Sequence, residues 1–140
     1  MKNRKRIGAG DFLLLLLSVV FAVGIRSFFA PCGLKEDGSW MSCHWAGQTV
    51  AGAAGVLILL SVIHLFVRDG RIKQGLDAAV ILVALNTMLI PNHQVTLCMM
   101  PDMRCHRIMT PAVMICSILL AITAVLDGIY RQRVRRKHED

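Results

Sequence analysis

Two short strings in this chain of 140 residues place a thioether, a thiol and an imidazole in the same order. The first reads Met41-Ser42-Cys43-His44 and the second reads Met103-Arg104-Cys105-His106. Each string has a further cysteine upstream, Cys32 for the first and Cys98 for the second. Side chains of these types indicate one of three chemistries: structural disulfides, a soft-metal site or thiol–disulfide exchange.

Structural disulfides are the simplest interpretation of these four cysteines. An even number of cysteines on the oxidising side of a membrane is typical of a disulfide framework. Pairing within each segment, Cys32 with Cys43 and Cys98 with Cys105, is the simplest connectivity. In the chain-entropy model, bonds that close loops of this size each contribute about 3 kcal/mol. Pairing between the two segments stays open as well, if the segments meet.

The two strings also offer soft or borderline ligands to copper or zinc. Metal binding needs thiolates, so it competes with disulfide formation, and the C-x-x-C spacing of standard zinc sites is missing. For thiol–disulfide exchange, the histidine after each thiol could lower the pKa of that thiol. No other cofactor is predicted. The candidate metal ligands are Met41, Cys43, His44, Met103, Cys105 and His106.

Four apolar runs must position these residues, at 11–30, 46–67, 76–92 and 108–130. The chain is 55% hydrophobic and only 18% charged. A helix needs about 20 apolar residues to cross a bilayer, and lipid offers the backbone no other partners. We therefore predict an all-α transmembrane four-helix bundle in a single integral membrane domain. Because span, cysteine and Met-x-Cys-His follow one another twice, we expect two pseudo-repeated helical hairpins with cysteine-bearing outer loops at 31–45 and 93–107.

The basic residues, which give a formal net charge of +7, are distributed by segment. Most of them lie before the first run, at 68–73 and at 131–137, and four spans would put these segments on one side. Cytoplasmic loops collect Lys and Arg, so we expect both termini in the cytoplasm and the cysteines outside. The predicted partner is the lipid bilayer, and nucleic acid is excluded. The first run could instead be a signal peptide cleaved near Ala22-Val23-Gly24.

Two charged side chains stand near the ends of their apolar runs. We expect Arg26 and Asp127 to reach the lipid headgroups, although an intramembrane charge is always a candidate functional residue. Asp127 has Arg131 one helical turn later as its expected partner. The expected partners of Arg26 are Glu36, Asp37 or Asp102.

Other polar and small residues inside the runs predict helix packing. His64 and Asn86 are expected to hydrogen-bond between helices. Gly47, Ala51 and Gly55 recur every four residues, which predicts close helix contact within the bundle or docking to another membrane protein. Thr110 followed by a proline is typical of a helix N-cap and predicts the start of the fourth helix.

The chain resembles the bacterial domain-of-unknown-function family numbered 4418. This resemblance implies a small four-span protein with a retained first helix, in the bacterial cytoplasmic (inner) membrane. It implies no activity, and a link of such proteins to ABC transporter permeases implies at most an accessory role. The motifs that carry it are Pro31-Cys32, Met41-x-Cys43-His44-Trp45-x-Gly47-Gln48, Met103-x-Cys105 and Pro111-Ala112.

The sequence favours a role in an assembly over a role as an enzyme. It has no phosphate-binding loop, nucleophile elbow, H-E-x-x-H motif or array of paired carboxylates. We expect an accessory or interaction subunit of a membrane assembly, such as a transporter with an ABC permease, whose outer end carries a disulfide-bearing cap. The alternative is a membrane thiol–disulfide or soft-metal protein that uses the two Met-x-Cys-His strings.

Overall fold

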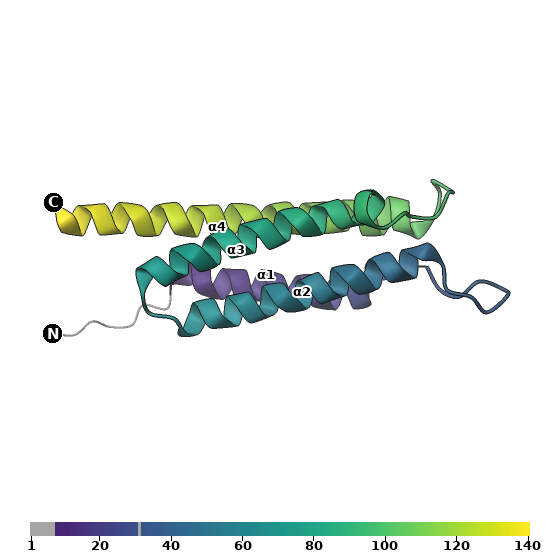
Figure 1. Cartoon of the computed structure of the whole chain (residues 1–140), viewed down its shortest axis with the longest axis horizontal. Helices are drawn as coiled ribbons and strands as arrows, with labels where there is room; N and C mark the ends of the chain where they lie inside the picture. Colours follow the sequence, from purple (N-terminus) through teal and green to yellow (C-terminus); the bar gives the residue numbers. More distant parts are fainter. Residues whose placement is uncertain (1–7, 31) are drawn as a thin grey trace.

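The computed structural model describes residues 8–30 and 32–140, and their regular secondary structure is helical (Figure 1). Each of the four long helices is long and apolar enough to cross a membrane, which confirms the all-α four-helix bundle and makes the chain a membrane protein. Two short π-helical turns, η1 (Ile90–Gln94) and η2 (Cys105–Met109), flank the last long connection. The long helices are α1 (Ala9–Arg26), α2 (Ser42–Phe66), α3 (Gly70–Leu89) and α4 (Thr110–Glu139).

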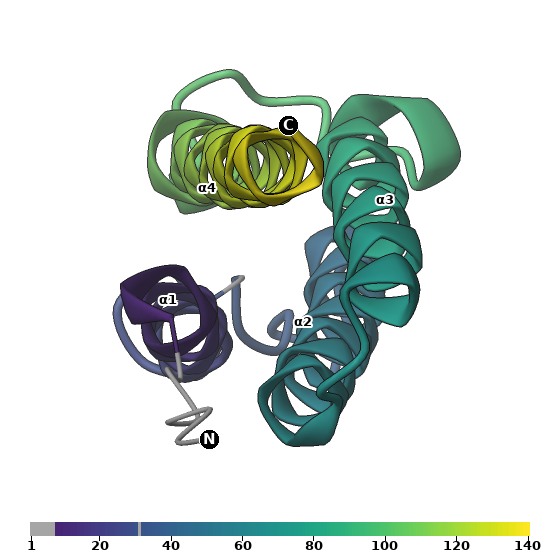
Figure 2. The same cartoon turned by 90° about the vertical axis from the view of Figure 1, so that its left-hand side faces the viewer.

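The helices form a square when they are viewed along the bundle (Figure 2). Helices α1 and α3 each pack against both α2 and α4, so α1 faces α3 across the bundle axis and α2 faces α4. The C-terminus, the start of α1 and the α2–α3 connection lie at one end, here called the termini end (Figure 1). The two longer connections lie at the opposite end, here called the loop end.

Small residues form much of the bundle centre, where Ala46, Ala54, Ala84 and Ala124 are fully buried. Lipid gives helices no hydrophobic reason to associate, so close approach through small side chains is the expected means of packing. The outer surface is apolar, which suits contact with lipid tails. One side chain on each long helix illustrates this, with exposed fractions above 60%: Phe12 61%, Leu59 63%, Leu82 67% and Leu126 61%.

The helix ends differ from the predicted spans. Helix α2 begins four residues early, so the first Met-x-Cys-His string lies mostly on a helix. Helix α3 begins at Gly70 because the Asp69 carboxylate accepts a hydrogen bond from the Arg71 backbone N–H at 3.0 Å. The predicted N-cap at Thr110 is wrong. The chain is already helical through η2, and the Thr110 hydroxyl donates to the Cys105 carbonyl at 2.8 Å.

The predicted stripe along α2 is buried within the bundle only at its first residue, and docking of this stripe to another membrane protein stays a prediction. Gly47 is buried, Ala51 is half-buried and Gly55 is exposed. A four-residue step overshoots a 3.6-residue turn by about 40°, so the stripe rotates out of the interface. The buried face instead follows steps of three and four residues, with the neighbours Ala46 and Gly47 both buried, and comprises Cys43, Ala46, Gly47, Val50, Ala54, Leu57, Ser61 and His64.

Candidate functional sites

The loop end brings together the four cysteines that the sequence singled out. The Sγ atoms of Cys32, Cys43, Cys98 and Cys105 all lie within 4.8 Å of one another. Cys43 and Cys105 form a disulfide between Cα atoms 6.3 Å apart, and the Cys32 Sγ lies 3.0 Å from the Cys105 Sγ. Cys43 and Cys105 are fully buried, whereas Cys32 and Cys98 are half-buried thiols. Four sulfurs this close can exchange disulfide bonds or share one metal ion.

This disulfide joins the two Met-x-Cys-His strings, so the expected pairing within each segment is wrong for Cys43 and Cys105. The reason is their place on the helices. Cys43 lies in the first turn of α2 and Cys105 begins η2, which leads into α4. Both side chains face the bundle interior, where α2 and α4 oppose each other across the axis. The fifth cysteine, Cys116, lies apart from this cluster on α4.

The histidines of the two strings have other contacts. The His44 ring stacks on Trp40 with ring centroids 3.9 Å apart, and the His106 Nε2 lies 2.7 Å from the Cys98 carbonyl oxygen. Among the described His, Cys, Asp and Glu side chains, only the four cysteines gather here closely enough to share a metal. The structure therefore does not bring the imidazoles of the predicted metal set to the sulfurs. The two methionines of the predicted metal set, Met41 and Met103, are half-buried, and each lies two residues before a clustered cysteine.

A pocket of about 380 Å³ opens beside Cys32, between the ends of α1 and α2. Its polar lining side chains are Arg26, Trp40, His44 and Gln48. Within the described residues no carboxylate forms an ion pair with Arg26, so its expected partners are wrong. The exposed Asp102 instead binds Arg107 at 2.8 Å.

Another expected partner of Arg26, Asp37, stabilises its own turn. Its carboxylate accepts hydrogen bonds from the Ser39 hydroxyl at 2.7 Å and from the Ser39 backbone N–H at 3.0 Å. The hydrogen bond from the Ser39 hydroxyl, followed by that from the backbone, lowers the pKa of Asp37. This turn reverses the chain ahead of α2, with Gly38 at φ 83°.

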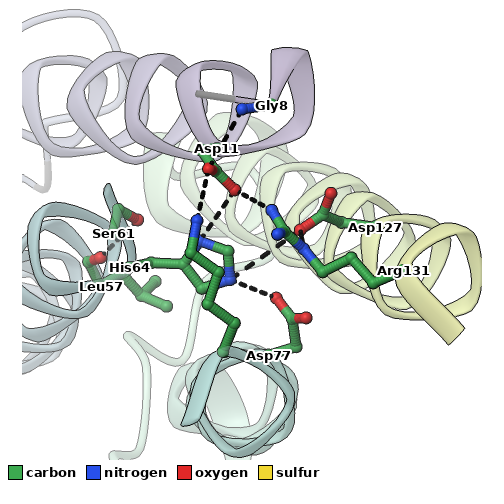
Figure 3. Close-up of polar contacts among 9 residues, drawn as sticks. Gly8, Asp11, Leu57, Ser61, His64, Asp77, Asp127 and Arg131 are labelled. Atoms are coloured by element: carbon green, nitrogen blue, oxygen red, sulfur yellow. Dashed lines mark hydrogen bonds and ion pairs between the residues drawn. The ribbon is translucent and has the colours of Figure 1, made fainter. Parts of the chain in front are cut away.

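The termini end holds a second cluster, made of ionisable side chains from all four long helices (Figure 3). Five of its six members are at most 9% exposed as whole residues. Charged groups buried this deeply in a membrane bundle are candidate functional residues by default. The cluster comprises Asp11 from α1, His64 from α2, Lys73 and Asp77 from α3, and Asp127 and Arg131 from α4.

Asp11 is the most highly connected member. Its carboxylate accepts a hydrogen bond from the Lys73 Nζ at 2.7 Å, contacts the Arg131 guanidinium, and lies 3.0 Å from the His64 Nδ1. It also accepts from the Gly8 backbone N–H at 3.3 Å, which caps α1. One carboxylate thus connects α1 to the other three helices.

His64 occupies the centre of the cluster, and its second ring nitrogen faces α3 and α4 (Figure 3). The His64 Nε2 lies 2.9 Å from an Asp77 carboxylate oxygen and 3.8 Å from an Asp127 oxygen. Asp127 is held by Arg131, whose Nε donates at 2.7 Å. The expected Asp127–Arg131 pair is therefore confirmed, but Asp127 faces the bundle interior and does not extend towards the headgroups.

The sequence-based interpretation missed three members of this cluster. Asp11 and Asp77 lie inside the apolar runs 11–30 and 76–92, and Lys73 lies in the basic segment 68–73, so their types alone do not single them out. The spacing of Lys73 and Asp77 by one helical turn was the available signal, because it puts both on one face of α3. Asn86 is exposed and accepts from the Gln94 side chain at 2.7 Å, so its predicted role between helices is wrong.

An open groove of about 1240 Å³ reaches this cluster from the termini end. It lies between the starts of α1 and α3 and the last turns of α4, and Asp127 and Arg131 line it. Helix α1 approaches α4 closely here, because a Cβ atom at Gly10 would overlap the Asp127 carboxylate. The buried ionisable groups therefore lie next to an opening that is large enough to hold water.

Four apolar helices, a sulfur cluster at one end and an ionisable cluster at the other define a small polytopic membrane protein. The family model described as "Domain of unknown function (DUF4418)" matches residues 14–130, and the chain belongs to this family. No curated protein and no solved structure matches the chain. The family match includes all four clustered cysteines as well as His64, Lys73, Asp77 and Asp127.

Proposed function

We propose that this protein is a membrane thiol–disulfide exchange protein whose working centre is the four-cysteine cluster. The observation that carries the proposal is the position of the Cys32 thiol, 3.0 Å from a sulfur of the Cys43–Cys105 disulfide. Thiol–disulfide exchange proceeds by attack of a thiolate on a disulfide sulfur, so attacking and attacked atoms already lie close together. A purely structural disulfide has no need of two further thiols at this distance.

The exchange step within the cluster balances without an external reagent. The Cys32 thiolate attacks the Cys105 sulfur, the Cys32–Cys105 bond forms, and Cys43 leaves as a thiolate. The half-buried Cys32 and Cys98 thus connect the buried disulfide to the surface. A dithiol of a partner protein would be oxidised to a disulfide as the Cys43–Cys105 bond is reduced to two thiols.

Renewal of the disulfide requires a two-electron acceptor, and a membrane quinone is the class of molecule that suits a membrane bundle. Two cysteine thiols and one quinone give one disulfide and one quinol, which accounts for both electrons and both protons. The pocket beside Cys32 has the polar side chains Arg26, His44 and Gln48 for carbonyl oxygens of such a molecule. The proposal thus includes a membrane quinone as the electron acceptor.

Disulfide mapping at controlled redox potential tests the exchange. The purified protein is equilibrated in detergent with glutathione buffers of increasing disulfide content, and free thiols are alkylated before mass spectrometry. We expect Cys43–Cys105 and Cys32–Cys105 bonds to interconvert across the series. Cys32→Ser should abolish the second species and keep the first, and Cys116→Ser serves as the matched control outside the cluster.

Two results would contradict thiol exchange. One is a single Cys43–Cys105 bond that persists until the protein unfolds. The other is purification of four reduced cysteines with one equivalent of zinc or copper, since four thiolates form a closed metal site. The second result would establish a soft-metal protein in place of an exchange protein.

We propose a second role, as an accessory subunit of a membrane assembly, on one observation. Gly52 and Gly55 lie on the outward face of α2 with open space before both, so another helix could approach the backbone there. Crosslinking in mild detergent followed by affinity purification should recover a membrane protein partner, such as an ABC transporter permease. Gly52→Leu with Gly55→Leu should remove that partner, whereas Leu82→Ala on the outer face of α3 should keep it. Recovery of the chain alone contradicts this role.

We further propose that the protein lies in a bacterial inner membrane with both termini in the cytoplasm. Exposed basic residues gather at the termini end, among them Arg68, Arg71 and Arg133, and the opposite side would be the oxidising one that disulfides need. The basic residues before Gly8 lie outside the described part of the chain. Reporter fusions at the C-terminus and at the 31–45 loop, active in the cytoplasm and outside respectively, test this topology.

We also propose that the bundle arose by duplication of one helical hairpin. Residues 62 positions apart meet at both ends, Cys43 with Cys105 in the disulfide and Asp11 with Lys73 in an ion pair. Equivalent residues of two copies meet only near a two-fold axis, and both pairs join helices that are diagonal in the square. Co-expression of the two hairpins, 1–68 and 69–140, as separate chains should give an associated bundle with the intermolecular disulfide.

A further inference from the structure

The His64 ring is flanked by carboxylates on both sides. Its Nδ1 lies 3.0 Å from an Asp11 oxygen, and its Nε2 lies 2.9 Å from an Asp77 oxygen. A neutral imidazole carries hydrogen on one nitrogen only, and the other nitrogen presents a lone pair. That lone pair would face an acceptor oxygen. The arrangement therefore requires one proton more than a neutral histidine and ionised carboxylates supply.

The charges of the cluster also indicate that one extra proton is required. Three carboxylates face two fixed cations, Lys73 on α3 and Arg131 on α4, so a neutral His64 leaves one negative charge. An uncompensated charge buried in a membrane bundle is costly. One added proton makes the cluster neutral. A divalent metal ion would leave the cluster with an excess positive charge, because Lys73 and Arg131 already contact Asp11, so the single remaining negative charge points to a proton as the ligand.

Two side chains of the cluster also lack hydrogen bonds. Both His64 nitrogens and both Asp77 oxygens are buried and make none of good geometry with the described residues. His64 is fully buried and Asp77 is 3% exposed, and the two side chains point at each other (Figure 3). Buried polar atoms normally have a partner. A proton shared between the ring and a carboxyl group would give these facing atoms a hydrogen bond.

Solution reaches the cluster through the groove at the termini end. Asp127 lines the groove at the termini end, and its carboxylate lies 3.8 Å from the His64 Nε2. We propose that His64, with Asp11, Asp77 and Asp127 around it, is a binding site for a single exchangeable proton that enters from the termini end. The site is separate from the thiol chemistry at the loop end and does not depend on it.

Nuclear magnetic resonance of protein with ¹⁵N-labelled histidine, in micelles near neutral pH, tests the proposal. We expect both His64 ring nitrogens to carry hydrogen, or one protonated carboxyl group to give an infrared carbonyl band that His64→Gln shifts. Removal of one carboxylate removes the need for the extra proton. Asp77→Asn should therefore leave His64 a neutral imidazole with one protonated nitrogen, and the exposed Asp102→Asn serves as the matched control.

A merely structural role for the cluster predicts different results. The proposal is overturned if wild-type His64 is neutral and no protonated carboxyl group is found, or if folded Asp77→Asn keeps the wild-type spectrum. If Asp77→Asn fails to fold, Asp127→Asn removes a carboxylate at the groove and must produce the same change in His64. Folding of each variant is checked by circular dichroism and by the Cys43–Cys105 disulfide.

Discussion

The two ends of the bundle each hold a pair of diagonal helices together, but they do so by different chemistry. At the loop end a covalent bond joins the helices α2 and α4, which are diagonal in the square. At the termini end an ion pair between Asp11 and Lys73 joins the other diagonal, α1 and α3. The sulfur cluster can be broken and remade by redox chemistry, whereas the ionisable cluster responds to protons. Each end is therefore sensitive to a different property of the solution that surrounds it.

The largest expected effect is the loss of the central carboxylate at the termini end. Asp11→Ala leaves Lys73 and Arg131 without their shared partner in a buried site. Removal of one member of a buried charge pair costs about 3–5 kcal/mol. Unfolding in mixed micelles should show this loss, and the exposed Asp102→Ala should show almost none. Wild-type stability in Asp11→Ala would mean that the ionisable cluster does not hold the helices together.

The next effect is the loss of the covalent link at the loop end. Cys105→Ser removes both the Cys43–Cys105 bond and the alternative Cys32–Cys105 bond, and it should lower the free energy of unfolding by about 2–4 kcal/mol. Addition of reductant to the wild type should lower the stability by a similar amount and should not change Cys105→Ser further. Cys116→Ser controls for loss of a sulfur elsewhere. If reductant leaves the free energy of unfolding of the wild type unchanged, the disulfide does not hold the loop end together.

A smaller effect is expected where α1 approaches α4. The Cβ atom of Gly10→Ala would overlap the Asp127 carboxylate, and such overpacking costs about 1–3 kcal/mol. Gly55→Ala, which meets open space, should keep or slightly raise the stability because alanine favours helix. Equal effects of the two substitutions on the unfolding midpoint would contradict the close contact at the termini end.

The smallest effect is expected at the exposed ion pair of the loop end. Arg107 and Asp102 have side chains that are 71% and 83% exposed, and a pair this open contributes less than about 1 kcal/mol. Arg107→Ala should leave the unfolding free energy nearly unchanged at any salt concentration. A large loss would show that this pair, and not only the sulfurs, holds the loop end together.

The sequence predicted the architecture and singled out the four cysteines because both depend on local patterns. Long apolar runs indicate membrane helices wherever they occur, and the repeated Met-x-Cys-His strings are visible without a fold. The disulfide partner of Cys43 could not be predicted, because it depends on which buried helix positions meet on the bundle axis. Helix ends were also missed, since η2 extends the fourth helix upstream of Thr110.

The ionisable cluster was harder to predict for a physical reason. A charged residue near the end of an apolar run usually reaches the headgroups, so Asp127 was expected to do so. Only the packing of four helices shows that Asp11, His64, Asp77 and Asp127 lie at the same depth and face inwards. No single run contains enough of the cluster to reveal it.

The Cys43–Cys105 disulfide has a mechanical consequence. A covalent bond between α2 and α4 at the loop end prevents these helices from separating there, so they can only pivot about that point. Any widening of the oxidised bundle must then be a hinge motion about the disulfide, with the largest displacement at the end far from it. The widest displacement would fall at the groove beside Asp127 and Arg131.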